Sequence, residues 1–446
     1  MTFENKVGRR EKQRLFRGAI PLASESNRVL NIFSYSMLFG TFAAMLGIIL
    51  YYVYAFASLY HGNSDFDWLL GIFSDFVSIM NAALADSPYL LEDGASYPAI
   101  AILVLYPFAW ICRKVFSSYA GVEGMDIDEL TSRVIRHPEF WVALILFFLI
   151  CISAVLFLII KSYKLDLRAS VKTAVAVILS APFVYAIMRG NTIYFALIFL
   201  LAFLWLYQSP KAWVREIAYV CLALAGSIKI YPLFFGVFLL RKKKIFASCR
   251  VAVYFLAISF IAFYFFPAGM GDFDVFLDNL GGFMSDTERL FSLRNLSASS
   301  LLYKLVYLFC PAATESAAFG VVNLVLLGLI FLAAAVTAIA TRSQFSRAAI
   351  ASAVVILIPT ISYFYVLIFE IIPFMEYLRE YGELPVWKKR LYGVLFLFLF
   401  FTFFLLPQCF IPHALAVIVM MVIEERDTVK HEMIPWFKQK RLAKIK

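Results

Sequence analysis

Long apolar runs, separated by short polar segments, follow one another along almost the whole chain. A helix needs roughly 20 apolar residues to cross about 30 Å of hydrocarbon, and run after run approaches that length. The pattern predicts an all-α, polytopic membrane bundle of about twelve transmembrane helices, give or take two. The predicted spans lie near residues 31–59, 97–112, 140–160, 170–188, 191–207, 213–240, 245–266, 297–312, 318–340, 348–372, 391–406 and 409–423.

The charges between the runs predict how this bundle is oriented. Seven Lys or Arg residues precede residue 29, and none occurs from Val29 to Ile111, where a polar, acidic loop separates the first two runs. Short loops rich in Lys and Arg remain in the cytoplasm. We therefore expect cytoplasmic basic tails at residues 1–28 and 425–446, one bundle at residues 29–424, and outer loops at about 61–96 and 267–296.

The remaining basic segments agree only in part with an even number of spans. Residues 241–244 and 388–390 fall in the cytoplasm, as the charge rule requires. The 213–240 run contains Pro232 and could instead be two short helices, which would change the local parity. The same count puts two basic groups outside, against the rule: Lys161, Lys164 and Arg168, and also Arg342 and Arg347.

Composition and cysteine usage narrow the class further. Hydrophobic residues make up 63% of the chain and charged residues 16%, with a mean hydropathy of +0.83, whereas soluble domains are about 45–50% apolar and about 25% charged. The net charge of +10 is concentrated in the tails and short loops, which suits membrane lipids with anionic headgroups and argues against nucleic acid. The six cysteines lack metal-ligand spacing, so we expect neither a disulfide framework nor a metal site.

Both predicted outer loops contain amphipathic helical segments. Ser74 can cap a helix that begins at Asp75, an acidic residue in the first turn is favoured by the helix dipole, and Pro88 ends the segment. Apolar residues recur at helical spacing in between, and the loop at 267–296 repeats this style. We expect two helices lying in the interface plane, a platform that suits capture of a lipid-borne substrate better than passage through a pore.

A series of short motifs runs through the chain in a definite order. They are Ser74-Asp75-Phe76, Pro88-Tyr89, Ser96-Tyr97-Pro98, Tyr106-Pro107-Phe108, Ala181-Pro182, Gly190-Asn191, Ser227 to Pro232, the basic cluster 241–244, Asn295-Leu296-Ser297 and Pro359 to Tyr363. Together they resemble glycosyltransferase family 87, over roughly residues 70–370. Members of that family are integral membrane enzymes that use polyprenyl-phosphate mannose or arabinofuranose. The chain departs from the family at Asn191, where Gln is usual, and at Tyr363-Phe364-Tyr365, where Trp and His are more frequent.

The resemblance implies the GT-C fold, a membrane helical bundle in which a carboxylate of the first outer loop acts as general base; Asp75 occupies that place. Displacing a polyprenyl phosphate requires the acceptor hydroxyl to lose its proton as it attacks, and an Asp can take that proton. The leaving phosphate is a stable anion, so a cationic or hydrogen-bonding clamp suffices, and we expect no metal or other cofactor. With one catalytic carboxylate, inversion at the anomeric carbon is expected.

Several polar residues near the motifs are candidates for substrate binding. Arg289 and Arg294 lie in the second outer loop, where a guanidinium can meet a phosphate at headgroup level. Lys229 is ionisable and deep in an apolar run, which suggests a function, but the predicted topology puts it nearer the cytoplasmic face, where snorkelling or pairing is an equal alternative. The predicted substrate-binding set is Arg294, Asn295, Arg289, Tyr97, Lys229, Arg189, Asn191 and Tyr363.

Other interpretations compete with this one. Asp75 could be only a helix-start acid, and Asp65-Phe66-Asp67 weakly resembles a metal-binding pair. A transporter or flippase would also have about twelve spans, but it should show internal repeats, and none stands out. A lipid-linked glycan polymerase or ligase usually relies on arginines in a large late outer loop, whereas the corresponding loop here is medium-sized and lies in the middle of the chain.

The sequence thus predicts a multi-pass enzyme of the cell membrane with both termini in the cytoplasm. It would move a mannose or pentofuranose from a lipid-linked donor to a glycan or glycolipid acceptor of the cell envelope. The transfer would take place on the outer face of the membrane.

Overall fold

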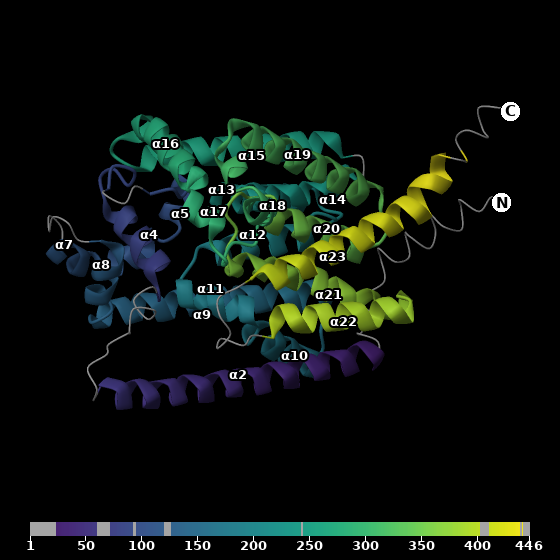
Figure 1. Ribbon diagram of the computed structural model, residues 1–446, viewed down its shortest axis with the longest axis horizontal. Coiled ribbons are helices and arrows are strands. Elements are labelled where there is room, and N and C mark those ends of the chain that lie inside the picture. The colour runs from purple at the N-terminus through teal and green to yellow at the C-terminus, as the bar shows by residue number, and fades with distance from the viewer. Residues whose placement is uncertain are drawn as a thin grey trace.

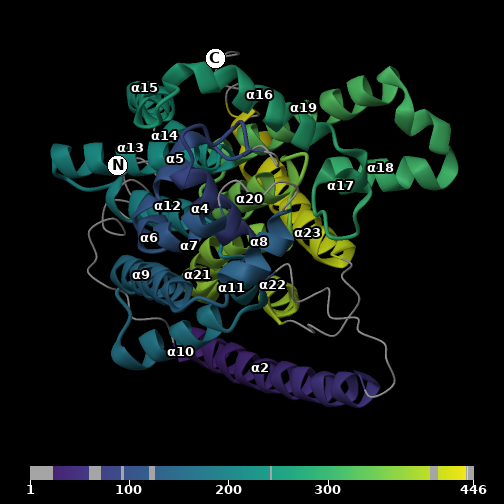
Figure 2. The same ribbon diagram turned by 90° about the vertical axis from the view of Figure 1, so that its left-hand side faces the viewer.

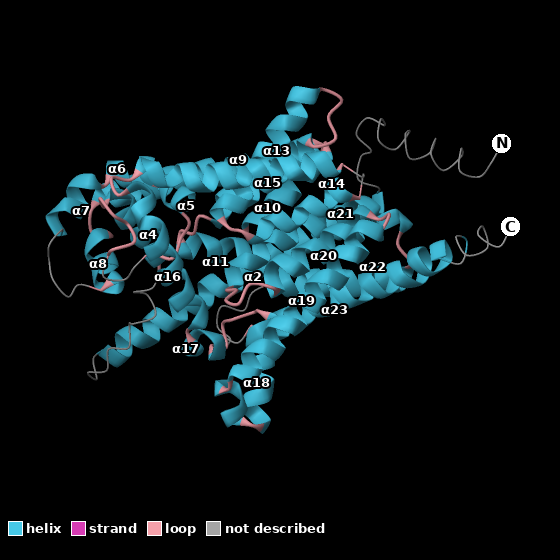
Figure 3. Ribbon diagram, turned by 90° about the horizontal axis from the view of Figure 1, so that it is seen from above, coloured by secondary structure: helices cyan, strands magenta, loops and turns pink. Residues whose placement is uncertain are grey.

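The computed structural model describes residues 24–59, 72–91, 95–119, 126–241, 244–401, 410–437 and 439, with side chains from Glu25 to Leu46 in the first of these ranges. Within these ranges every regular element is a helix and none is a strand, as the colouring of Figure 3 shows. The expected all-α fold is therefore confirmed.

The elements range from a 36-residue helix to single turns. The α-helices are α2 (Ser24–Leu59), α4 (Ser74–Leu84), α5 (Ala99–Leu103), α6 (Tyr106–Ile111), α7 (Arg113–Tyr119), α8 (Ile127–Val134), α9 (Pro138–Tyr163), α10 (Leu167–Ile178), α11 (Ala181–Arg189), α12 (Ile193–Leu206), α13 (Ala212–Ile228), α14 (Val237–Leu240), α15 (Ile245–Ile261), α16 (Asp272–Ser285), α17 (Thr287–Phe291), α18 (Ala298–Phe309), α19 (Ala317–Ala340), α20 (Gln344–Leu357), α21 (Ile371–Glu380), α22 (Val386–Phe400) and α23 (Ile411–Thr428). The shorter elements are η1 (Tyr231–Gly236), η2 (Ala262–Phe265), η3 (Gly269–Gly271), η4 (Pro311–Glu315), η5 (Phe364–Glu370), η6 (Tyr381–Glu383) and the π-turn η7 (Val429–Met433).

The described helices do not confirm a count of twelve spans. Four of them are long and apolar enough to cross a membrane, at Glu25–Leu46, Pro138–Tyr163, Ile245–Phe265 and Ala317–Ala340. A fifth span results if α10 and α11, which meet at an angle of 57°, are taken as one broken helix. Several other apolar runs form helices of only 10–17 residues.

The bundle has two distinct ends, at the left and right of Figure 1. Helices α4, α7, α8 and α16 lie at the left, which we call the Asp75 end, and Figure 2 looks onto it. The first residues of α2 and α22 and the last residues of α23 lie at the right, which we call the basic end. There the ammonium of Lys389 pairs with Glu25 at 3.1 Å, so the start of α22 lies beside the start of α2.

Hydrogen bonds tie several helices together at the basic end. Glu380 of α21 accepts a bond from the Ser343 hydroxyl at 2.8 Å, just before α20 begins. The Arg241 guanidinium donates to the carbonyl of Thr341 at 3.1 Å, just after α19 ends. The hydroxyl of Tyr163, the last residue of α9, donates to Glu376 of α21 at 2.8 Å.

These contacts correct the predicted topology. The basic residues at 161–168 lie just before and just after Tyr163, and Arg342 and Arg347 follow Thr341, so both groups lie at the basic end with Arg241. The predicted topology differs from the structure because of residues 97–112, where the apolar run predicts a span. That segment forms α5 and α6, two short helices that stay at the Asp75 end and pack on α4 and α9. Removing this crossing reverses the direction of α9 and satisfies the charge rule at 161–168.

A buried ionic cluster also lies between α20, α22 and α23. Lys388 pairs with Glu424 at 2.7 Å and with Asp427 at 2.8 Å, and the Ser346 hydroxyl donates to Glu424 at 2.5 Å. Removing one partner of such a pair typically costs about 3–5 kcal/mol because the other charge stays buried. The cluster therefore holds the three helices in register.

The two predicted outer helices exist, but only one keeps an exposed apolar face. Most residues of α4 are buried, against α5, α6 and α8, so this helix lies inside the protein and not in the interface plane. Its N-cap is Phe73, and Ser74 is its first helical residue, so the predicted Ser74 cap is wrong. In α16 only Asp272 and Phe276 are buried, and this helix remains compatible with an interfacial position.

The 213–240 run takes the two-helix alternative. Helix α13 ends at Ile228, Lys229 is extended, and η1 and α14 continue beyond Pro232. Proline lacks the backbone N–H and clashes with the preceding turn, which is why the helix cannot continue through it. The break leaves Lys229 half-buried, directly after the last residue of α13.

Candidate active site

The N-terminus of α4 is docked onto the C-terminus of α11. The N–H of Phe73 donates to the carbonyl of Met188 at 2.7 Å. Gly190 then ends α11 in the left-handed region at φ 63°, and a Cβ on it would lie 2.4 Å from Cβ of Phe76. Both the backbone angle and the close approach require glycine here. This junction brings Asp75 next to the residues on either side of Gly190.

Asp75 is buried and held by two side chains. The Arg189 guanidinium reaches Oδ1 at 2.5 Å and the Asn191 amide donates to Oδ2 at 2.7 Å. The side-chain oxygen of Asn191 accepts a hydrogen bond from the N–H of Ile193 at 3.0 Å, which fixes the orientation of the amide. An ion pair and a second donor hold the carboxylate in one orientation. Two predicted substrate-binding residues, Arg189 and Asn191, thus contact the predicted base directly.

Lys229 lies at the Asp75 end of the bundle. Its ammonium sits 4.6 Å above the ring of Tyr97 and interacts electrostatically with Asp75. It makes no ion pair or hydrogen bond with any described residue. This cation–π contact alone leaves most of the hydrogen-bonding capacity of the ammonium unused.

Five tyrosines surround Asp75, two of them predicted and three not. Tyr97, Tyr185, Tyr363 and Tyr365 each interact electrostatically with Asp75, and Tyr231 interacts with Tyr97 and Tyr365. All five side chains are half-buried. Within the described chain no hydrogen bond engages any of their hydroxyls.

None of these hydroxyls is among the buried polar atoms that lack a partner, so each one is accessible to a ligand beside Asp75. Five unbonded hydroxyls and one unbonded ammonium around a fixed carboxylate form a lining that can bind several oxygens at once. A sugar and a phosphate both present many oxygens. The lining therefore suits a glycosyl phosphate better than an apolar ligand.

The sequence held a weak signal for the three tyrosines that were missed. Tyr231 lies inside the motif Ser227 to Pro232, and Tyr365 follows Tyr363 by two residues. Tyr185 precedes Arg189 by four residues, so the two lie on the same face of α11. Helical spacing from Arg189 is the signal that would have found Tyr185.

Asn295 is a structural residue in this geometry. Its amide donates to the carbonyl of Thr360 at 3.1 Å, and its oxygen accepts the N–H groups of Ser297 and Ser362, each at 3.0 Å. These bonds join the loop after α17 to the loop before η5. They place Tyr363 beside Asp75, while every polar atom of the Asn295 side chain is used.

The two arginines of the second outer loop are exposed. Arg289 pairs with Asp286 at 2.8 Å and lies 4.4 Å above the ring of Phe283. Arg294 has no acidic partner among the described residues and interacts electrostatically with Tyr185. Backbone and side-chain bonds from Arg289 lower the pKa of the Asp286 carboxyl below its usual value. Arg294 is thus the more available of the two.

Helix α16 is fastened to the loop that leads into the site. The Ser87 hydroxyl donates to Asp272 at 2.6 Å, and the Asn279 amide donates to the carbonyl of Tyr89 at 2.9 Å. The Tyr89 hydroxyl in turn donates to the carbonyl of Tyr97 at 3.2 Å. Burial, with a smaller contribution from Asp272, raises the pKa of Tyr89 far above its ordinary value, so this hydroxyl stays a donor. We call these contacts the α16 clasp.

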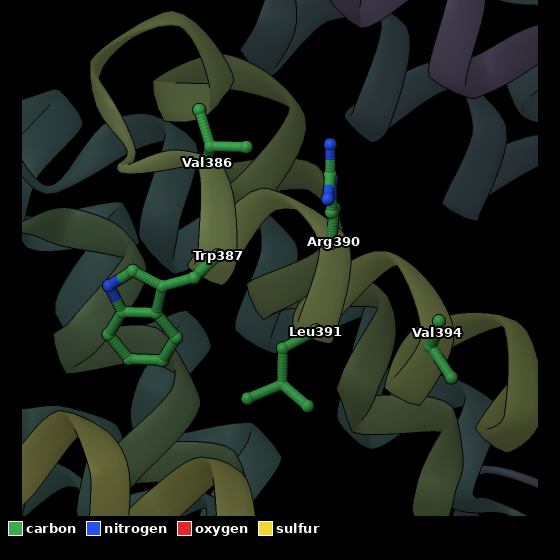
Figure 4. Close-up of a pocket in the computed structure, with 5 residues that line it drawn as sticks. All are labelled: Val386, Trp387, Arg390, Leu391 and Val394. Carbon is green, nitrogen blue, oxygen red and sulfur yellow. The ribbon is translucent and has the colours of Figure 1, made fainter.

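The described residues around Asp75 include no metal-binding cluster, and the surface hollow along α22 lies elsewhere. Across the described ranges no three His, Cys, Asp or Glu side chains gather to hold a metal ion; Asp65 and Asp67 lie outside those ranges. A hollow of about 730 Å³ lies along α22 (Figure 4), in the part of that helix toward the basic end, away from Asp75. It is lined by Val386, Trp387, Arg390, Leu391 and Val394.

Comparison with known proteins gives one result for this chain. The family model for glycosyltransferase family 87 matches residues 96–362. A search of curated proteins finds no match. Asp75 precedes the matched segment, whereas its partners Arg189 and Asn191, and also Lys229, lie inside it. The structure therefore attaches the predicted base to the matched part of the chain.

Proposed function

Because the chain belongs to glycosyltransferase family 87, we propose that it transfers a sugar from a polyprenyl-phosphate donor to a glycan or glycolipid acceptor, with Asp75 as general base. The observation that carries this proposal is the fixed Asp75 carboxylate within a lining of unbonded hydroxyls and one unbonded ammonium. Family membership supports the glycosyl transfer itself, and the lining supports a donor that carries phosphate.

The reaction has one bond formed and one broken. The acceptor oxygen bonds to the anomeric carbon as the bond from that carbon to the phosphate oxygen breaks. The electron pair of the broken carbon–oxygen bond leaves with the phosphate, and the proton of the acceptor hydroxyl passes to Asp75. A positioned general base is worth about 10²–10⁴-fold in rate. No second described carboxylate lies in the tyrosine lining to act as nucleophile, which favours inversion.

Lys229 is the better candidate for the phosphate clamp. Its ammonium lies near Asp75 without being paired to it, so both groups can act on one substrate. Arg189 is committed to Asp75, and Arg294 is exposed at the edge of the site. We therefore assign the leaving phosphate to Lys229, with Arg294 in a secondary role, and Asn191 and Arg189 to holding the base.

The proposed setting is the cell membrane, with the Asp75 end on the outer face and both tails in the cytoplasm. The basic residues grouped at the opposite end of the bundle support this orientation. A polyprenyl-phosphate donor carries its reactive phosphate at headgroup level. The donor sugar proposed is mannose or a pentofuranose, and the acceptor is a glycan or glycolipid of the cell envelope.

A donor comparison tests the proposal. Purified full-length protein is offered radiolabelled polyprenyl-phosphate mannose, polyprenyl-phosphate arabinofuranose or the corresponding nucleotide sugars, with its own membrane lipids as acceptors. Transfer from a polyprenyl phosphate with inverted anomeric configuration is expected. Transfer from nucleotide sugars only would refute the donor assignment. Long ladders of added sugars would instead favour a polymerase.

A further inference from the structure

The tyrosines around Asp75 divide into two groups with different surroundings. Tyr97 and Tyr231 accompany Lys229, which sits above the Tyr97 ring, and the Tyr231 ring packs edge-on against Phe369, 6.0 Å away. Tyr97, Tyr185 and Tyr363 all interact with Arg189, but Tyr185 also interacts with Arg294, and Tyr363 with Arg289.

The second group forms a continuous aromatic surface with Tyr365. The rings of Tyr185 and Tyr365 are nearly parallel, at 22°, with centroids 6.5 Å apart, and Tyr363 lies 6.1 Å from Tyr365. The Tyr185 ring is held in place by edge contacts with Phe364 at 5.5 Å and Phe410 at 6.1 Å. Fixed rings with free hydroxyls offer an apolar face for the C–H groups of a sugar and donors for its oxygens.

The chemistry assigns the two groups to different substrates. In an inverting displacement the acceptor oxygen and the leaving phosphate lie on opposite sides of the anomeric carbon. The only unpaired ammonium in the described lining, Lys229, marks the phosphate side. Tyr185 and Tyr363 border the exposed Arg289–Arg294 segment at the Asp75 end, where an acceptor can enter.

We propose that Tyr185, Tyr363 and Tyr365 form the subsite for the acceptor sugar, distinct from the donor side at Lys229, Tyr97 and Tyr231. The proposal rests on the proposed function, because it presupposes a sugar acceptor that attacks a glycosyl phosphate. It adds Tyr185 and Tyr365 as acceptor-binding residues, and it makes the acceptor a saccharide recognised through both its ring face and its hydroxyls.

Binding of small glycosides tests the subsite without any transfer. The full chain in lipid nanodiscs is mixed with octyl mannoside, glucoside, galactoside and arabinofuranoside below their micelle-forming concentrations, with octane-1,2-diol as the control for the alkyl chain. Saturation-transfer NMR reports which protons touch the protein. Sugar-ring protons of at least one glycoside should be saturated by the parent, and that signal should fall severalfold in Tyr185→Ala and in Tyr365→Ala. The exposed Tyr264 (70%) provides the control variant, Tyr264→Ala.

The KM values of the two substrates then distinguish an acceptor-binding role from a donor-binding role. With the glycoside that the parent glycosylates fastest, Tyr185→Phe should raise the KM for that glycoside about twofold to tenfold, the value of one hydrogen bond, while the KM for the polyprenyl-phosphate sugar stays within about twofold. Tyr185→Ala should raise the glycoside KM further. A rise in the donor KM with the glycoside KM unchanged would overturn the assignment.

The failure of the proposed function has a different signature. Glycoside binding that depends on Tyr185 and Tyr365, without transfer from any polyprenyl-phosphate sugar, supports the subsite and rejects the donor. If no glycoside is saturated more than octane-1,2-diol, or if Tyr185→Ala and Tyr264→Ala behave alike, the subsite is rejected, and the donor comparison still stands.

Discussion

At Asp75, one substitution can distinguish a catalytic role from a structural role, because Asp and Asn differ only in one oxygen that becomes an amide nitrogen. Its carboxylate accepts from Asn191 and pairs with Arg189. Asp75→Asn keeps the size of the side chain but cannot take a proton, so the transfer rate should fall about 10²–10⁴-fold. The measurement is initial transfer rate from a polyprenyl-phosphate sugar, alongside the melting temperature.

The stability change in the same variant should be small. The Arg189 side chain is 32% exposed, so water partly compensates the lost ion pair and its cost falls well below that of a fully buried pair. A folded Asp75→Asn protein that transfers sugar within about threefold of the parent would show that Asp75 only starts α4.

Gly190 controls where Asp75 lies. Gly190→Ala puts a side chain at φ 63°, at a cost of about 1 kcal/mol, and places its Cβ 2.4 Å from Cβ of Phe76, which forces α4 away from α11. We expect a lower melting temperature and a loss of activity in whatever protein remains folded.

The matched control for Gly190 is Gly281→Ala, in the middle of α16. A Cβ there meets nothing within 4 Å, and alanine favours a helix over glycine by about 1 kcal/mol. This variant should be as stable as the parent or slightly more stable. Equal behaviour of the two variants in thermal unfolding would contradict the role given to the junction between α4 and α11.

Among the elements, α16 is expected to influence the site through its hydrogen bond to the backbone carbonyl of Tyr89. Asn279→Ala removes the bond to the carbonyl of Tyr89, so residues 85–91 and 95–97 should exchange amide hydrogens faster. Turnover should fall because Tyr97 is no longer held beside Lys229. Hydrogen exchange and the transfer rate are the two measurements.

Asp278, the exposed neighbour of Asn279 on α16, is the control position. Asp278→Ala should leave both the exchange of 85–97 and turnover unchanged. Faster exchange confined to α16 itself in Asn279→Ala, with residues 85–97 as protected as in the parent, would mean that the α16 clasp does not hold the loop.

Helix α4 shows what the spacing of apolar residues can predict and what it cannot. The pattern from Asp75 to Leu84 correctly predicted a helix, because apolar residues at 3.6-residue spacing are a local property. It did not show what covers the polar face. Helix α8 packs on α4 together with α5 and α6, so a helix expected at the membrane interface lies inside the protein.

At the scale of the whole molecule, the two ends of the bundle predict which cysteines can be labelled. In a variant without native cysteines, Asp86→Cys at the Asp75 end should react with a membrane-impermeant maleimide in intact cells. Gly382→Cys, at the basic end between α21 and α22, should react only after the cells are opened. Both positions are exposed, so accessibility to solvent does not explain a difference.

The reverse labelling pattern would place the site in the cytoplasm and rule out transfer on the outer face. Labelling of both positions in intact cells would mean that the bundle is not embedded as proposed. The same experiment with Arg342→Cys tests the corrected topology, because the sequence alone put Arg342 outside and the structure puts it at the basic end.

The sequence by itself determined the helical membrane class and the family, and it led to the hypothesis that Asp75 is the base, because apolar runs and short motifs are formed by neighbouring residues. Tertiary structure decided what Asp75 touches, because Arg189 and Asn191 are 114 and 116 residues away along the chain. It also decided that 97–112 stays at one end, that Lys229 lies beside Asp75, and that five tyrosine hydroxyls there have no hydrogen bond to any described residue. Hydropathy records that a residue avoids water, but it does not distinguish lipid from protein as the surroundings, nor does it identify distant partners.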